Sequence, residues 1–141
     1  LDRKKLRDEH DKYFHDIDEH VKALNVKYGG KPALFVAPVG QAVLTLREKI
    51  ADGAAPGLTK QTDLFTDPIG HAKPPLALLV AYCYYAQIYG QSPVGLPVPT
   101  ALRGAVDEET AVKLNQLLQE IAWRTVSEHP LSGVRVKSAA D

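Results

Sequence analysis

The chain has 141 residues, of which 45% are hydrophobic and 24% charged, enough for one domain with a buried core. Seventeen basic residues balance seventeen acidic ones, so there is no surplus of Lys and Arg to neutralise the phosphates of nucleic acids or anionic membranes. The single cysteine excludes an intrachain disulfide, a thiolate zinc cluster and an iron–sulfur centre. We therefore expect no nucleic-acid partner, no membrane partner and no metal.

The sequence begins at Leu1 and contains no methionine, from which we expect that a preceding segment has been removed or belongs to a longer protein. No apolar run follows the basic residues at the start, so no signal peptide is predicted and the compartment stays unassigned. The longest apolar stretch, residues 76–89, is too short to span a bilayer.

The first predicted element is an amphipathic helix over residues 3–28, followed by Gly29 and Gly30, which favour a helix end. Its apolar stripe recurs at steps of three and four residues: Leu6, His10, Tyr13, Ile17, Val21 and Leu24. Residues 32–39 form a short, nearly continuous apolar run, which predicts a strand buried on both faces. A second helix is predicted over residues 41–52.

The second half of the chain opens with a loop over residues 53–62 and a short strand over residues 63–66. Residues 75–89 are apolar almost all round, which predicts a buried helix. A proline-rich connector follows, and Asp107 is a good N-cap for a last helix that ends near Glu128.

The order helix, strand, helix predicts an α/β domain. We expect a partial three-layer, flavodoxin-like fold over residues 1–129, rich in helix with few parallel strands, and a flexible tail over residues 130–141. Because a stable sheet needs more strands than these, further strands are expected from outside the chain.

The most suggestive chemistry is Asp67 followed by His71 on a predicted loop that leaves a strand. A carboxylate held against an imidazole fixes its tautomer, and the imidazole can then act as a general base toward a hydroxyl nucleophile. The alternative is that Asp67-Pro68 is only a turn and His71 caps the next helix. His10, His15 and His20 are five residues apart, which rotates successive side chains about 140° around a helix, so they predict no shared metal site.

The stretch from Leu64 to Pro97, LFTDPIGHAKPPLALLVAYCYYAQIYGQSPVGLP, resembles the C-terminal region of SGNH (GDSL-like) hydrolases. That family has an Asp, a short spacer and a His, then a helix and a motif similar to residues 85–93. The run PALFVAPVG resembles the core strand that precedes this motif in the family.

The resemblance implies an SGNH-type esterase acting on carboxylesters or carbohydrate esters without a metal or organic cofactor. By that resemblance His71 is the catalytic base and Asp67 orients it. The spacer here has three residues instead of two, and the chain has neither the Gly-Asp-Ser motif of the nucleophile nor the Asn motif of the oxyanion hole. The serine of the triad is therefore expected outside this sequence, and the isolated chain is expected to be inactive.

The alternative is a non-catalytic helical interaction domain. Between Pro68 and Leu102 the only charged residue is Lys73, and an apolar surface of that extent usually has a partner. Both interpretations predict either a homo-oligomer or a missing N-terminal half.

Overall fold

The computed structural model describes residues 2–135 and contains, within them, five α-helices, one short 3-10 helix and no strand. The elements are α1 (Arg3–Lys27), α2 (Val39–Ala51), η1 (Gln61–Leu64), α3 (Pro74–Tyr89), α4 (Thr100–Arg103) and α5 (Glu108–Glu128). The expected α/β, flavodoxin-like, SGNH-type fold is wrong for this part of the chain, which is all-helical.

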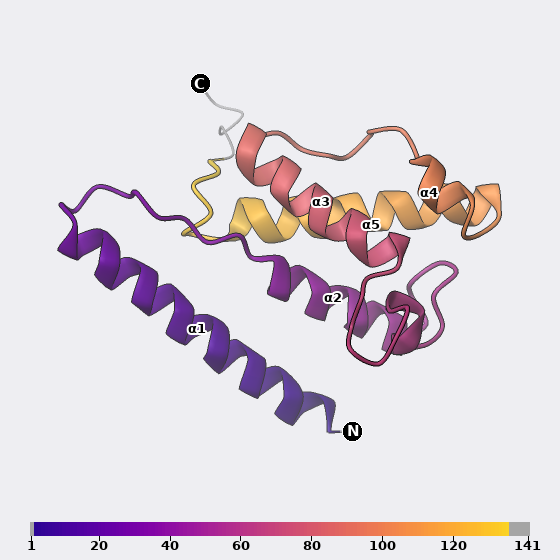
Figure 1. The fold of residues 1–141 in the computed structure, drawn as a ribbon, viewed down its shortest axis with the longest axis horizontal. Helices are drawn as coiled ribbons and strands as arrows, with labels where there is room; N and C mark the ends of the chain where they lie inside the picture. The colour runs from indigo at the N-terminus through magenta and orange to yellow at the C-terminus, as the bar shows by residue number, and fades with distance from the viewer. Residues whose placement is uncertain (1, 136–141) are drawn as a thin grey trace.

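Helices α2, α3 and α5 form the core, with α3 lying across α5 and α2 beside them (Figure 1). Leu46 of α2, Leu79 of α3 and Leu118 of α5 are completely buried there. Small residues on α3, such as Cys83 and Ala86, let the helices approach closely. The burial of Cys83 raises the pKa of its thiol to about 12, so this thiol is a packing group rather than a nucleophile.

The predicted helices are confirmed, because the signals that begin and end them are local. Asp107 caps α5 by accepting a hydrogen bond from the Thr110 N–H at 3.0 Å. Gly90 ends α3 in the left-handed conformation, at φ 62°. The short helix α4, which begins inside the proline-rich connector expected over residues 91–102, was not predicted.

The two predicted strands are wrong. Residues 32–38 run from α1 to α2 without a strand, and residues 31–35 are exposed rather than buried on two faces. Residues 61–64 form η1, and the only strand-like pairing in the described part of the chain is an isolated antiparallel bridge between Phe65 and Ala72. A strand needs a neighbour for its backbone hydrogen bonds, and no described segment supplies a ladder.

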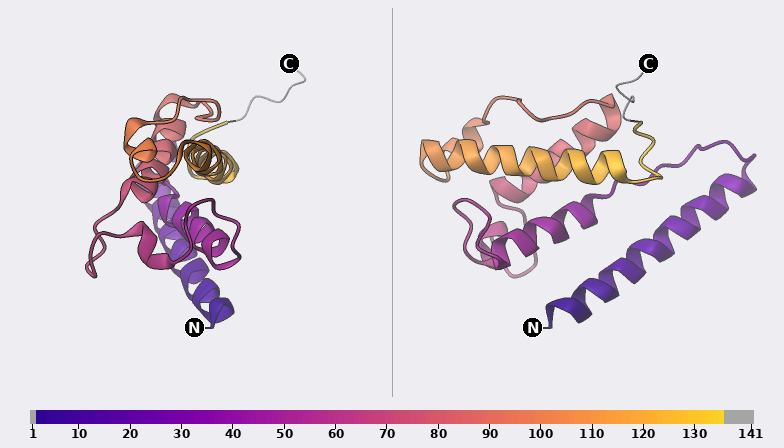
Figure 2. Two further views of the ribbon diagram at one scale, coloured as in Figure 1. Left: turned by 90° about the vertical axis from the view of Figure 1, so that its right-hand side faces the viewer. Right: turned by 180° about the vertical axis from the view of Figure 1, so that it is seen from behind.

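Helix α1 stands apart from the core in Figure 1 and in the right-hand view of Figure 2, and none of its residues is fully buried. Four residues of its predicted apolar stripe are half-buried: Leu6, His10, Val21 and Leu24. Polar contacts attach it to α2 and the residue after it, Arg3 to Asp52 at 2.7 Å and Arg7 to Glu48 at 2.9 Å, and the ring of Phe14 lies against Gly40 of α2. At the other end of the chain, residues 131–134 lie against residues 34–36 and α3, whereas residues 136–141 of the expected tail lie outside the described residues. No helix among the described residues is long and apolar enough to cross a membrane.

Candidate functional site

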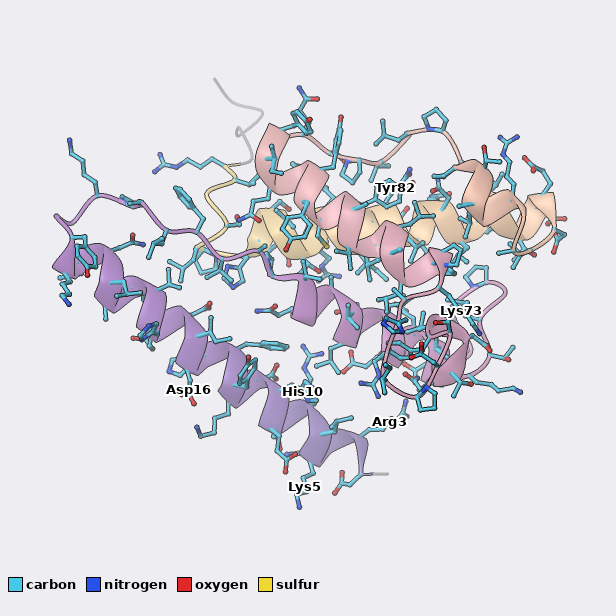
Figure 3. The ribbon with its side chains drawn as sticks, viewed as in Figure 1. Arg3, Lys5, His10, Asp16, Lys73 and Tyr82 are labelled. Atoms are coloured by element: carbon cyan, nitrogen blue, oxygen red, sulfur yellow. The ribbon has the colours of Figure 1, made fainter. Side chains whose placement is uncertain are left out.

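The candidate site is a tight loop between η1 and α3. The Thr66 N–H donates to the His71 carbonyl at 2.8 Å, and the Lys73 N–H donates to the Leu64 carbonyl at 2.9 Å, which ties the two ends of the loop together. Gly70 has φ 95°, a conformation that side chains avoid, and it lets the chain turn back. Figure 3 labels Lys73, where the loop meets α3.

Asp67 organises this loop through its carboxylate. Its Oδ1 atom accepts hydrogen bonds from the backbone N–H groups of Ile69, Gly70 and His71, at 3.0 to 3.2 Å. Its Oδ2 atom pairs with the His71 Nδ1 atom and accepts a hydrogen bond from the Thr66 hydroxyl at 3.3 Å. The hydrogen bond from the His71 side chain, helped by the backbone N–H groups of His71 and Gly70 and by the Thr66 hydroxyl, lowers the pKa of Asp67, so the carboxylate is ionised at neutral pH.

The imidazole of His71 is consequently oriented through one nitrogen only. Because an ionised carboxylate only accepts hydrogen bonds, Nδ1 must carry the proton that lies between the two side chains. The Nε2 atom of the neutral ring then has a free lone pair, and no hydrogen bond to it occurs among residues 2–135. The side chain of His71 is 71% exposed, so this lone pair is accessible to solvent.

The fold brings together Asp67 and His71, the two residues predicted from the sequence, but not at the predicted position in the fold. They lie on an exposed loop of an all-helical body and not at the edge of a sheet. A surface hollow between η1 and the loop is lined by Asp67, Phe65 and Lys73 among others, but His71 is not part of its lining.

A nucleophile beside His71 is absent from the described residues. The Thr66 hydroxyl is occupied by Asp67 and by the His71 carbonyl. Ser92 and Ser132 each accept a hydrogen bond from a backbone N–H two residues further along, and Ser127 donates to a carbonyl of its own helix. Ser138 lies outside the described residues. No group of three or more metal-ligating side chains occurs in the described part of the chain.

Sequence reasoning missed a second Asp–His pair. His129, which follows α5, places Nε2 at 3.3 Å from Oδ2 of Asp18 on α1, and both side chains are largely buried. The Leu131 N–H donates to His129 Nδ1 at 3.2 Å, so the ring proton of the neutral form is on Nε2. Asp18 lies on α1 and His129 directly follows α5, and no local pattern in the sequence indicates that they meet.

Comparisons of the chain with protein-family models, with curated proteins and with solved structures found no match.

Proposed function

We propose that Asp67 and His71 are the base half of a Ser-His-Asp acyl-transfer site in an ester hydrolase of SGNH type, whose serine and oxyanion-hole donors come from polypeptide outside residues 1–141. The observation that carries this proposal is the pairing of an ionised Asp67 with Nδ1 of an exposed His71. The sequence resemblance of residues 64–97 supports the choice of ester hydrolysis. The expected α/β fold does not, since the described residues are helical.

In the proposed reaction, His71 Nε2 accepts the proton of the serine hydroxyl while the serine oxygen attacks the ester carbonyl. The resulting imidazolium then gives that proton to the departing alkoxide, which leaves an acyl-enzyme. A water molecule then attacks the acyl-enzyme with His71 again acting as the base, and the carboxylic acid is released. Asp67 remains ionised throughout, keeps the lone pair on Nε2 and stabilises the imidazolium.

The test measures hydrolysis of p-nitrophenyl acetate by two proteins. The isolated chain is expected to be no faster than an equal concentration of free imidazole, because it lacks a nucleophile. A longer polypeptide, extended by the residues encoded upstream of Leu1, is expected to hydrolyse the ester with burst kinetics. Ester hydrolysis by the isolated chain that His71→Ala abolishes would contradict the proposal, as would an inactive longer polypeptide.

Variants of the longer polypeptide assign the roles. His71→Ala is expected to lower kcat by about 10³-fold or more, and Asp67→Asn by roughly 10²- to 10⁴-fold. In this variant the amide oxygen can still accept hydrogen bonds from the backbone N–H groups of the loop. The amide nitrogen takes the place of the carboxylate oxygen that faces the imidazole. His20→Ala, which removes an exposed histidine of α1, is the matched control and should leave kcat unchanged. Equal activity of the His71 and His20 variants would exclude His71 as the base.

A non-catalytic role in association is the second candidate, and exposed apolar side chains favour it. Phe35 is 53% exposed, Ile88 is 71% exposed and Tyr89 is 66% exposed. The mutational test separates the two functions, because an interaction domain has no His71-dependent esterase activity.

A further inference from the structure

The residues that follow α5 tie the end of that helix to two distant parts of the molecule. Residues 131–134, here called the strap, run beside the linker between α1 and α2 (Figure 1). The Leu131 carbonyl accepts a hydrogen bond from the Val36 N–H of the linker at 2.9 Å. The Ser132 carbonyl accepts one from Gln87 Nε2 of α3 at 3.1 Å. The strap therefore connects the end of α5 to the linker and to α3.

The strap is held at its start by the imidazole of His129. The Leu131 N–H donates a hydrogen bond to His129 Nδ1 at 3.2 Å, which requires a lone pair on that nitrogen. The other ring nitrogen, Nε2, lies 3.3 Å from Oδ2 of Asp18 on α1, and both side chains are largely buried. The neutral ring with its proton on Nε2 suits both neighbours at once.

A second proton on the ring of His129 is compatible with only one of these neighbours. It goes to Nδ1, so that two donors, Nδ1–H and the Leu131 N–H, then face each other. The positive ring is attracted more strongly by the Asp18 carboxylate, and burial strengthens that attraction. Turning the ring over would give up this ion pair. Protonation therefore keeps the contact with α1 and breaks the contact with the strap.

The other charged groups around His129 leave Asp18 as its main electrostatic partner. Three cations and three carboxylates line the adjoining hollow beside α1, α2 and α5: Arg7, Lys49, Arg124, Glu48, Glu120 and Glu128. Their charges cancel, and two of the cations already pair with carboxylates of this set. Lys22 and Arg135 line the hollow that adjoins the strap, but both are exposed, so water and salt screen their charges.

We propose that His129 is an acid-sensitive latch, which holds the strap while the imidazole is neutral and releases it when the ring takes up a proton. The proposal is independent of the ester hydrolysis proposed above. Histidine ordinarily changes its charge between about pH 5 and pH 8. Because the open strap admits a proton at Nδ1 that the closed strap excludes, acidification shifts the population toward the open form. Opening uncovers the ring of Phe35, which lies against Gly133 in the closed form.

The first experiment follows amide hydrogen exchange of the 141-residue chain from about pH 8 to about pH 5. The protection factor of the Val36 amide, which bonds to the Leu131 carbonyl, reports the closed strap. That of the Leu118 amide, in the middle of α5, reports global stability. We expect the ratio of the Val36 factor to the Leu118 factor to fall about tenfold on acidification. The NMR signals of the His129 ring should titrate with the same midpoint.

The second experiment repeats the measurement on a variant whose side chain at the latch cannot titrate. In His129→Asn, the amide oxygen can accept the Leu131 N–H as Nδ1 does, but it takes up no proton. The ratio should then be independent of pH, whereas His15→Asn, at an exposed position of α1, should behave like the wild type.

Three results would overturn the proposal. The first is a Val36 amide that keeps its protection while His129 becomes charged. The second is the same fall in the wild-type chain and in His129→Asn. The third is a His129 that stays neutral down to about pH 5. The coincidence of the two midpoints in the wild-type chain tests the latch even where the asparagine variant does not fold.

Discussion

Two Asp–His pairs in this molecule have the same chemical groups and opposite accessibility. Asp67 and His71 are four residues apart on an exposed loop, and only Nδ1 of the imidazole is used. Asp18 and His129 join α1 to the end of α5, and both nitrogens of that imidazole face a protein partner. Only the exposed pair leaves a nitrogen lone pair that can accept a proton from a substrate or a nucleophile. The exposed pair is therefore the one for which we propose chemistry, and the buried pair attaches α1 to the end of α5.

The largest expected difference between the pairs is in stability. His129→Ala leaves the Asp18 carboxylate largely buried with its Oδ1 atom already unpartnered, so the free energy of unfolding should fall by about 2 kcal/mol. His71→Ala removes an exposed side chain and should leave the free energy of unfolding within the error of the measurement. Urea unfolding of both variants checks this. Equal destabilisation would contradict the assignment of the buried pair to attachment.

The second expected difference is in chemical reactivity. Diethyl pyrocarbonate acylates the unprotonated nitrogen of an accessible imidazole. His71 should therefore react at a rate close to that of the exposed His15 and His20, whereas His129 should react only after unfolding. Mass spectrometry of peptides from a time course measures the four rates. A His71 that resists the reagent would show that Nε2 is not accessible.

The smallest expected effect is on the pH dependence of stability. The unfolded chain binds a proton at Asp67 more readily than the folded chain, because pairing with His71 lowers the folded-state pKa below the ordinary 3.8. The contribution of ionised Asp67 to the free energy of unfolding is thus fully present above pH 3.8, its ordinary pKa. It is lost as the pH falls through the lower pKa of the folded state. The difference in Tm between the wild-type chain and Asp67→Asn should accordingly narrow on acidification. A difference that stays constant with pH would argue against an ionised, paired Asp67.

The features that could be predicted from the sequence are those that depend on residues close together in the chain. The N-cap at Asp107, the glycine at the end of α3 and the apolar periodicity of α1 each act within a few residues, and the helices they predict are present. The contact between Asp67 and His71 is equally local, which is why spacing alone suggested it.

Long-range pairing was not predictable in the same way. The apolar run of residues 32–39 has the composition of a buried strand, but strand formation depends on a neighbour that the described residues do not supply. The α/β expectation failed for that reason. The incomplete burial of the α1 stripe and the contact of Asp18 with His129 also depend on how distant elements pack, and their residues give no local sign of it.

The most direct measurement is the tautomer of each imidazole, read from long-range ¹H–¹⁵N NMR spectra at about pH 8.5, above the titration range of an ordinary histidine. We expect His71 to carry its proton on Nδ1 and His129 to carry its proton on Nε2. In the Asp67→Asn variant, His71 should lose its preference for the Nδ1-protonated tautomer, and His129 should keep its proton on Nε2. A His71 protonated on Nε2 in the wild-type chain would contradict the claim that Asp67 holds it ready to act as a base.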